Sequence, residues 1–370
     1  MKILLVGEYS NVHWTLAEGL RALGHEVTVV SDGDRWKDYP RDISIVRHGR
    51  SFISGVKYLM SLAQVWPRLR GYDVVQLINP VFLDLKAERI MPFYRRLRRN
   101  NGKVFMGAFG IDKYWVKAGM DCRTFRYSDF NIGSELRQNA DNDLMIADWL
   151  LGAKGMLNDR IANDCDGIIA GLYEYYASYN PYFSEKLTFI PFPIVVDESR
   201  QKLRKADDGV VKFFVGVQKA RSAYKGTDIM LRALRRVEAD YPGRCQVSVA
   251  ESVPFAEYVK MLNDSHVMLD QLYSYTPAMN ALQAMAQGMV VVSGGEPENY
   301  EIIGETELRP IVNVQPNEES VYQQLVRLVE HPTLIEDLSR QSMEYIRRHH
   351  SHIAVAAQYV NAWNNRNINI

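Results

Sequence analysis

The residues best suited to bind a ligand lie between residues 266 and 293, where a short helix is predicted to start just beyond a strand. The stretch opens with a compact apolar run typical of a buried parallel strand. Thr276 is predicted to cap the helix that follows, and Pro277 fits its first turn. In an open α/β sheet, ligands bind at the carboxyl ends of the strands, and a helix start favours anions. The sequence therefore predicts an anion site near Ala278 and Met279.

The second half of this stretch resembles the donor-site segment of retaining GT-B glycosyltransferases of the family 4 type. It reads Gln283-Ala-Met-Ala-Gln-Gly-Met-Val-Val-Val292, and the family pattern is Glu, seven residues, Glu-Ala-Met-Ala-x-Gly-x-Pro-Val-Val. Tyr275 stands at the first Glu position, which the family associates with the donor sugar and diphosphate. Gln283 stands at the second, which usually accepts hydrogen bonds from the donor ribose. An amide can accept there too, as a neutral and weaker partner.

The resemblance also assigns two cations to the donor diphosphate. Lys225-Gly226 matches the Lys-Gly that the family places at a helix start, whereas Gln218 stands where the family has Arg. Arg221 or Lys219 is expected to supply that charge instead. Such cations would stabilise a departing nucleoside diphosphate most strongly in the transition state. Solvated loop cations are the alternative interpretation.

Further site residues are expected in loops elsewhere in the chain. Gly7, Asn11 and His13 lie in the loop after the first predicted strand, which in the family faces the interdomain cleft and could reach the donor phosphates or the acceptor. A surface or packing role is the alternative for His13. Val253 is expected to meet the nucleobase with its backbone. No Gly-x-Gly-x-x-Gly follows the first strand, which weighs against a dinucleotide dehydrogenase.

The sequence Phe109-Gly-Ile-Asp112 resembles the family's His-Gly-x-Asp. Phe109 stands where a histidine would contact the transferred sugar. Asp112 could accept a hydrogen bond from an acceptor hydroxyl, or it could cap the next turn, and both roles remain open. Residues 122–139 look irregular and are predicted to form a lid or an acceptor loop.

No metal site and no cofactor are expected, and the nucleotide-sugar donor, of UDP or GDP type, enters as a substrate. Asp32-Gly-Asp34 has the spacing of the metal-binding pair in GT-A enzymes, but its place after a predicted strand favours a turn. Asp141-Asn-Asp143 is weaker still. The histidines at 349, 350 and 352 lack the spacing and acidic neighbours of metal ligands.

Alternating strands and helices predict an α/β chain with two Rossmann-like domains facing a cleft. Residues 1–193 are expected to form the N-terminal acceptor domain and residues 194–345 the C-terminal nucleotide-sugar donor domain. Residues 346–370 are expected to form a helix that returns to the first domain, as in GT-B chains. Two prolines between Leu187 and Ile194 mark the boundary. Other expectations include helices at 83–99 and 141–164, and loop and turn at 296–307.

The composition fits a two-domain cytoplasmic protein. The 370 residues contain 44 Lys and Arg, 44 Asp and Glu and three cysteines, which suggests no nucleic-acid partner and no disulfide framework. No signal peptide or membrane span is predicted. The segment 41–103 has thirteen basic and only four acidic residues. It is interpreted either as solvated helix faces or as a peripheral contact with anionic lipid at the inner face of the membrane.

The resemblance implies transfer of a sugar from a nucleotide-sugar to a carbohydrate or lipid-linked acceptor. Retention of configuration, independence of metal and a role in cell-envelope polysaccharide synthesis are expected. One alternative is a catalytically degenerate binding protein, because Tyr275, Gln283 and Phe109 all replace polar family residues. A nucleotide-sugar epimerase is a second alternative. It would need a pair of acidic side chains in the cleft, where only Glu8 and Asp112 are obvious.

Overall fold

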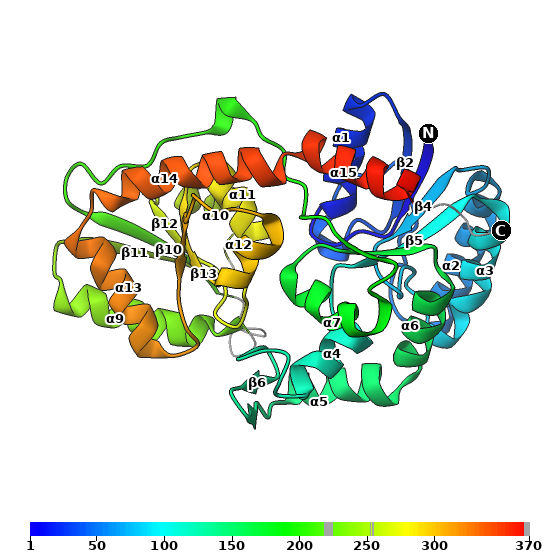
Figure 1. The fold of residues 1–370 in the computed structure, drawn as a ribbon, viewed down its shortest axis with the longest axis horizontal. Helices are drawn as coiled ribbons and strands as arrows, with labels where there is room; N and C mark the ends of the chain where they lie inside the picture. Colours follow the sequence, from blue (N-terminus) through cyan, green and yellow to red (C-terminus); the bar gives the residue numbers. More distant parts are fainter. Residues whose placement is uncertain (218–224, 252, 254, 366–370) are drawn as a thin grey trace. The chain divides into compact units, whose positions relative to one another are not determined.

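A computed structural model describes residues 1–217, 225–251, 253 and 255–365 of the chain (Figure 1). The chain divides into two compact units. The first unit contains Met1–Asp121, Asn142–Pro193 and His352–Ile370, and the second contains Cys122–Asp141 and Ile194–Ser351. Relative to the expected boundaries, the chain returns to the first unit after Ser351 instead of residue 345. A piece from the middle of the first half also belongs to the second unit.

The first unit is built on a sheet of parallel strands, seven of them within the described residues, in the order β3-β2-β1-β4-β5-β8-β9. The residues of β1 from Ile3 to Val6 are all apolar and buried, as expected for a parallel sheet covered on both faces. The strands are β1 (Lys2–Val6), β2 (Glu26–Ser31), β3 (Ile43–Ser44), β4 (Val74–Leu77), β5 (Lys103–Ala108), β8 (Gly167–Ala170) and β9 (Leu187–Phe189).

The last helix of the chain packs against the first helix of this unit, as Figure 1 shows for α15 and α1. A Cβ atom at Gly19 would lie 2.2 Å from the carbonyl oxygen of His352, so only glycine permits this approach. The predicted return of the C-terminal helix is therefore confirmed. The helices are α1 (Val12–Ala22), α2 (Phe52–Val65), α3 (Met91–Asn100), α4 (Lys113–Met120), α5 (Ala140–Ile146), α6 (Ala153–Asp164), α7 (Tyr173–Phe183) and α15 (His352–Asn365).

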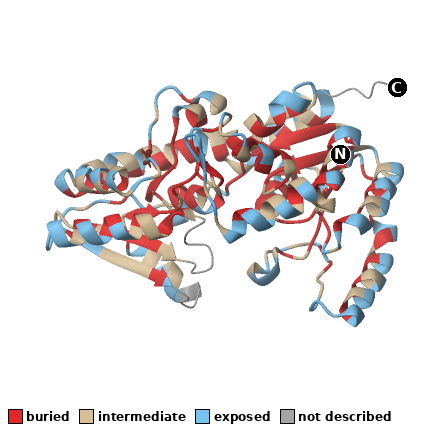
Figure 2. Cartoon of the chain, turned by 90° about the horizontal axis from the view of Figure 1, so that it is seen from below, coloured by how far each residue is buried: buried red, intermediate tan, exposed pale blue. Residues whose placement is uncertain are grey.

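The second unit has its own parallel sheet, with five strands among the described residues in the order β11-β10-β12-β13-β14. Buried residues follow the strands of both units, and exposed residues lie on the outer helix faces (Figure 2). The strands are β10 (Val211–Val217), β11 (Cys245–Glu251), β12 (Val267–Leu269), β13 (Val290–Ser293) and β14 (Ile311–Asn313). The helices are α9 (Thr227–Asp240), α10 (Phe255–Asn263), α11 (Met279–Ala286), α12 (Pro297–Ile303), α13 (Glu318–Glu330) and α14 (Leu334–Tyr345).

Three predicted elements are wrong in extent or type. The helix expected at 83–99 begins only at Met91, after a 3-10 turn at Ala87–Arg89. The helix expected at 141–164 is interrupted at Gly152, which is extended and separates α5 and its π-helical end from α6. The region 296–307 contains the helix α12, which starts with a proline and ends at Gly304 in the left-handed conformation.

The piece Cys122–Asp141, which we call the hairpin segment, lies between α4 and α5 in the sequence but belongs to the second unit. It contains the two-stranded antiparallel ribbon of β6 (Asn131–Ile132) and β7 (Glu135–Leu136). Asn131 is fully buried and donates to the carbonyl groups of Phe125 and Gly133, at 2.9 and 3.0 Å. The segment is therefore an ordered part of the second unit.

Candidate functional site

A lysine and a carboxylate meet at the carboxyl edge of the second sheet. Lys225 Nζ lies 3.7 Å from Asp270 Oδ1, and the Asp270 side chain, directly after β12, is almost fully buried. The backbone of Leu272 also donates to the carbonyl of Lys225, at 2.9 Å. The start of α9 is therefore tied to the loop after β12, and Lys225 lies at the edge where open α/β sheets bind ligands.

Gly226 makes this arrangement sterically feasible. It is the N-cap of α9 and has a φ of 71°, which side chains rarely adopt. An added Cβ would lie 2.7 Å from the Cβ of Leu272 and 2.9 Å from Cε2 of Tyr273. Any other residue would push α9 and Lys225 away from the loop after β12.

The helix α11 starts at Met279 with Ala278 as its N-cap, and no side chain caps it. The prediction that Thr276 caps this helix is therefore wrong. Pro277 disfavours the helical conformation for the residue before it, and Ala278 is itself extended, with φ −89° and ψ 179°. The N–H groups of a first helical turn have no partner within their own helix, which makes a helix start suited to an anion.

A tyrosine links α11 to the Lys225 pair. The hydroxyl of Tyr258 hydrogen-bonds with the side chain of Asn280 in the first turn of α11. Burial raises the pKa of this hydroxyl, and the negative charge of the nearby Asp270 raises it further. Tyr258 also contacts Gly216 near the end of β10. Lys225, Asp270, Tyr258 and Asn280 thus line the carboxyl edge of the sheet from α9 to α11.

The remaining predicted donor residues are distributed around this edge. Gln283 is half-buried, one turn beyond the start of α11, and Thr276 is buried before it. Val253 follows β11 and is half-buried. Arg221, Lys219 and Gln218 lie outside the described residues.

Tyr275, at the position of the first family Glu, is turned onto the hairpin segment. Its hydroxyl accepts a hydrogen bond from the backbone N–H of Arg126 at 2.6 Å. The guanidinium of Arg126 lies 4.8 Å from the centre of the Tyr275 ring, and Tyr127 packs at 5.0 Å. Burial raises the pKa of Tyr275 to about 12, so the hydroxyl keeps its proton. The side chain therefore holds the hairpin segment against the loop after β12.

Glu296 is a buried carboxylate in this region that the sequence interpretation missed. It accepts from Arg126 at 2.8 Å, Tyr127 at 2.7 Å, Asn313 at 3.0 Å and Gln315 at 2.5 Å. Burial by itself would raise the pKa of Glu296, but these hydrogen bonds outweigh it and hold the pKa below its usual value. The motif Gly-Gly-Glu-Pro after β13 was the available indication, because a proline at the first helical position marks a helix start.

In the first unit, the loop after β1 is closely packed and contains residues in the left-handed conformation. Gly7 has a φ of 86°, and an added Cβ would lie 2.3 Å from Cγ2 of Ile78. Asn11, the N-cap of α1, is also left-handed, with a φ of 69°. Its side-chain amide donates to Thr15 at 3.2 Å. Strained backbone of this kind is often found at functional sites.

His13 is fully buried and points one ring nitrogen into this loop. Nδ1 lies 2.8 Å from the carbonyl oxygen of Gly7, so Nδ1 carries the proton. Within the described residues, the other nitrogen, Nε2, has no hydrogen-bond partner. Burial lowers the pKa of His13 to about 3, against a weaker opposite effect of the Gly7 carbonyl. His13 is therefore neutral, with Nε2 as an acceptor.

Glu8 caps the start of α1 from inside the protein. Its two carboxyl oxygens accept from the backbone N–H groups of His13 at 3.1 Å and Trp14 at 2.9 Å. Burial raises the pKa of Glu8 to about 8, although these backbone hydrogen bonds oppose the rise.

The sequence left two roles open for Asp112, contact with an acceptor hydroxyl and capping of the next turn, and the structure shows it as the N-cap of α4. It is fully buried, accepts from the backbone of Trp115 at the start of α4 and accepts from the hydroxyl of Tyr179, both at 2.9 Å. Burial raises the pKa of Asp112 to about 7. Phe109, at the position of the family's sugar-contacting histidine, packs against His13 and Phe192.

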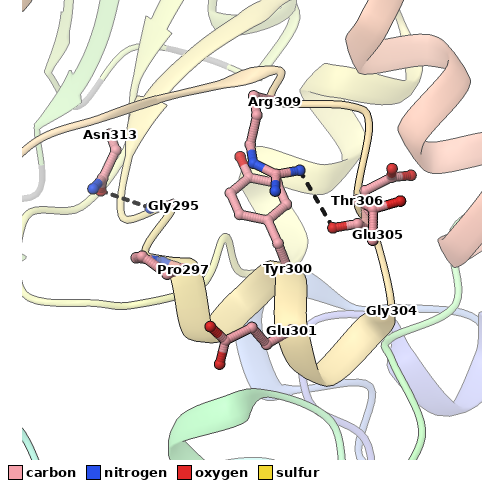
Figure 3. A pocket seen from close by; sticks show the side chains of 9 residues that line it. All are labelled: Gly295, Pro297, Tyr300, Glu301, Gly304, Glu305, Thr306, Arg309 and Asn313. Carbon is pink, nitrogen blue, oxygen red and sulfur yellow. Dashed lines mark hydrogen bonds between the residues drawn. The ribbon is translucent and has the colours of Figure 1, made fainter.

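A separate cavity of about 490 Å³ opens beside α12, where Arg309 lies over the ring of Tyr300 at 4.3 Å (Figure 3). Glu301 and Glu305 also line it. The predicted donor residues that the structure describes do not line this cavity. In the described part of the chain, no group of three His, Cys, Asp or Glu side chains could hold a metal ion.

No protein-family model matches the sequence, and no curated protein does. Solved structures match in fold. Sucrose-phosphate synthase from Thermosynechococcus elongatus is 12% identical, with 98% of each chain covered and a TM-score of 0.63. Anabaena HepE in complex with UDP and glucose is 12% identical, with 99% of this chain and 100% of that chain covered and a TM-score of 0.59. The catalytic domain of starch synthase IV from Arabidopsis thaliana, bound to ADP and acarbose, is 10% identical, with 99% of each chain covered and a TM-score of 0.55.

These structures have the GT-B glycosyltransferase fold, and the predicted α/β fold class with Rossmann-like sheets is therefore confirmed.

Proposed function

We propose that the chain is a glycosyltransferase that moves a sugar from a nucleotide-sugar to a carbohydrate or lipid-linked acceptor. The observation that carries the proposal is the row of Lys225, Asp270 and Asn280 along the carboxyl edge of the second sheet, between two helix starts. A cation beside helix starts suits a diphosphate. UDP and ADP are bound in two of the structures with this fold. We expect a UDP- or GDP-sugar as donor.

The mechanism we propose is a transfer with retention and without a metal ion. The bond between the sugar and the diphosphate breaks, and the electron pair stays on the departing nucleoside diphosphate. Lys225 and the N–H groups near Ala278 and Met279 stabilise this charge. The acceptor oxygen forms the new bond on the face that the diphosphate leaves, and a donor phosphate oxygen takes the acceptor proton.

The tautomer of His13 supports a role in orienting the substrate. A neutral imidazole whose Nδ1 donates to Gly7 offers Nε2 as an acceptor for a sugar or acceptor hydroxyl. Its low pKa argues against a role as general base. Asp112 acts in this proposal as a positioning residue, because its hydrogen bonds go to Trp115 and Tyr179. We expect this transfer to serve cell-envelope polysaccharide synthesis.

A nucleotide-sugar-binding protein without turnover is the second candidate. The observation that favours it is the packing of Tyr275 and Phe109, which both turn into the protein where family residues contact the sugar. An epimerase is less well supported, because Glu8 and Asp112 each cap a helix from a buried position.

Calorimetric titration with UDP-, GDP- and ADP-sugars, followed by an assay of sugar release and transfer, separates these functions. We expect one nucleotide class to bind and its sugar to be transferred to an added glycan or lipid-linked acceptor. Binding without hydrolysis or transfer would favour the second candidate. Absence of binding to all three classes would overturn the proposed function.

We also propose that the basic segment 41–103 contacts anionic membrane. The helix α2 in this segment buries Ser54, Tyr58 and Leu62, while Phe52 and Met60 on its other side are 86% and 60% exposed. The helix has no acidic residue. An exposed apolar helix face among basic residues suits an anionic lipid surface. In the described part of the chain, no helix is long and apolar enough to cross a membrane.

A further inference from the structure

The hairpin segment covers the ligand-binding edge of the second sheet, although the sequence places it in the first half of the chain. It contacts Tyr273 and Tyr275 in the loop after β12 and Glu296 in the loop after β13. Both loops follow parallel strands at their carboxyl ends. A segment at this place is part of any ligand site that the edge forms.

The hairpin segment is anchored at one point by a charged cluster. Arg126 pairs with Glu296 and Glu298, and Tyr127 donates to Glu296. Glu296 is also held by Asn313 and Gln315. With its hydrogen bonds satisfied, such a network holds its members in one arrangement. Arg126 is thus neutralised by two carboxylates and serves as the anchor.

A second arginine of the segment, Arg137, lies near the start of α9. Its backbone N–H donates to Phe130 at 2.7 Å, and its Nη1 donates to the carbonyl of Asp129 at 2.9 Å. Its guanidinium carbon lies 3.4 Å from the centre of the Tyr273 ring. A Cβ added to Gly226, directly after Lys225, would lie 2.9 Å from Cε2 of the same ring. Arg137 of the hairpin segment and Gly226 at the start of α9 therefore both lie beside the ring of Tyr273.

Among the described residues, the carboxylates Asp270 and Asp228 lie beside Lys225 or in the first turn of α9. Lys225 itself faces Asp270, which offsets part of its charge. Asp228, in the first turn of α9, also lies near Tyr273, but it pairs with Arg232 at 3.2 Å. A diphosphate carries more than one negative charge, and a guanidinium can bind two phosphate oxygens at once.

We propose that the hairpin segment completes the donor site and that its Arg137 binds the diphosphate of the nucleotide-sugar together with Lys225. This inference rests on the proposed function, because it assigns a further residue to the same site. Tyr275 has a matching role: at the position of the first family Glu, it holds the hairpin segment in place.

The test is calorimetric titration of the full chain with UDP, GDP and ADP, and with the corresponding nucleosides. For the nucleoside diphosphate that binds best, Arg137→Ala should weaken affinity about ten- to hundredfold. Affinity for the nucleoside, which has no phosphate, should not change. Arg137→Lys should recover part of the loss, because it restores the charge without the two-pronged geometry. A change in folding alone would affect both ligands equally.

Two comparisons separate the inference from the proposed function. Arg235→Ala removes an exposed arginine of α9 that pairs with Glu238 at 2.6 Å, and it should leave binding unchanged. If Lys225→Ala weakens diphosphate binding and Arg137→Ala does not, the inference is overturned and the proposed function stands. If the unaltered chain binds no nucleoside diphosphate, both are overturned. Equal losses for nucleoside and diphosphate in Arg137→Ala would also overturn the inference.

Discussion

Lys225 is the residue on which the proposed reaction depends most, because it directly precedes the N-cap of α9 and faces the buried Asp270. We predict that Lys225→Ala lowers kcat by about a hundred- to a thousandfold, the typical effect of removing a group that stabilises transition-state charge. The measurement is steady-state transfer with the donor identified by titration. Arg235→Ala should retain full activity. A kcat for Lys225→Ala equal to that of the unaltered chain would remove this lysine from the mechanism.

The two nitrogens of His13 allow a sharper experiment with two variants. An asparagine can donate to the carbonyl of Gly7 as Nδ1 does, whereas a glutamine reaches more nearly to the place of Nε2. We predict that His13→Asn folds normally but loses about tenfold or more in kcat/KM, from the loss of one hydrogen bond to substrate. His13→Gln should retain more activity. Equal activity of both variants and the unaltered chain would leave His13 with a packing role only.

Single residues also show where the sequence was informative. The position of Lys225-Gly226 at a helix start could be predicted, because it depends on local sequence. Tyr275 was not understood, because its partners Arg126 and Tyr127 lie about 150 positions earlier in the chain. The role of Glu296 depends on the same distant residues. Contacts between residues so far apart in the chain leave no periodic pattern in the sequence.

At the scale of elements, the strands were predicted well and helix ends less well. Apolar runs such as β1 and β13 are buried from both sides, so composition alone reveals them. The start of α11 was misplaced, because Thr276 and Pro277 suggested a cap two residues too early. The helix α12 was missed, although its proline at the start and its glycine at the end are typical helix boundaries.

The cap of α1 makes the stability of the protein depend on pH. The ordinary pKa of Glu8 is 4.5, and burial raises it to about 8 in the folded chain. Between these values the folded state binds more protons than the unfolded state, so stability falls as pH rises, by at most about 1.4 kcal/mol per pH unit. We predict that Glu8→Gln flattens the fall in Tm between pH 5 and pH 8.

This comparison needs the same pH series for both proteins. Asp112 contributes a fall up to about pH 7 and His13 a rise below its ordinary pKa of 6.5, but both are shared by the variant. The difference between the two Tm curves therefore isolates Glu8. Parallel curves would show that Glu8 has the same pKa in both states.

At the scale of the whole molecule, the proposed contact with anionic membrane depends on the exposed face of α2. We predict that the chain floats with vesicles containing anionic lipid and not with neutral vesicles, and that binding falls with added salt. Replacing Phe52, Ile53 and Met60 by serine should abolish flotation, because the apolar face no longer enters the lipid.

The control for this experiment is a triple serine variant at Leu144, Leu151 and Met156, which are exposed residues of α5, its π-helical end and α6. This variant should still float. If the α2 variant floats as well, the helix is not the contact. If the α2 variant instead changes the sedimentation of the protein without lipid, its apolar face joins two copies of the chain.

The path of the chain makes its two halves inseparable by simple truncation. The polypeptide passes from one unit to the other after Asp121, Asp141, Pro193 and Ser351. A fragment that begins at Ile194 would therefore leave out the twenty residues that shield Tyr275 and Glu296, and would present a bare aromatic ring and an unneutralised carboxylate to water. We expect such a fragment to aggregate or to melt at a lower temperature, and a synthetic peptide of residues 122–141 to restore it. Evolution of the second unit as an independent module would require the hairpin segment to be inherited together with it.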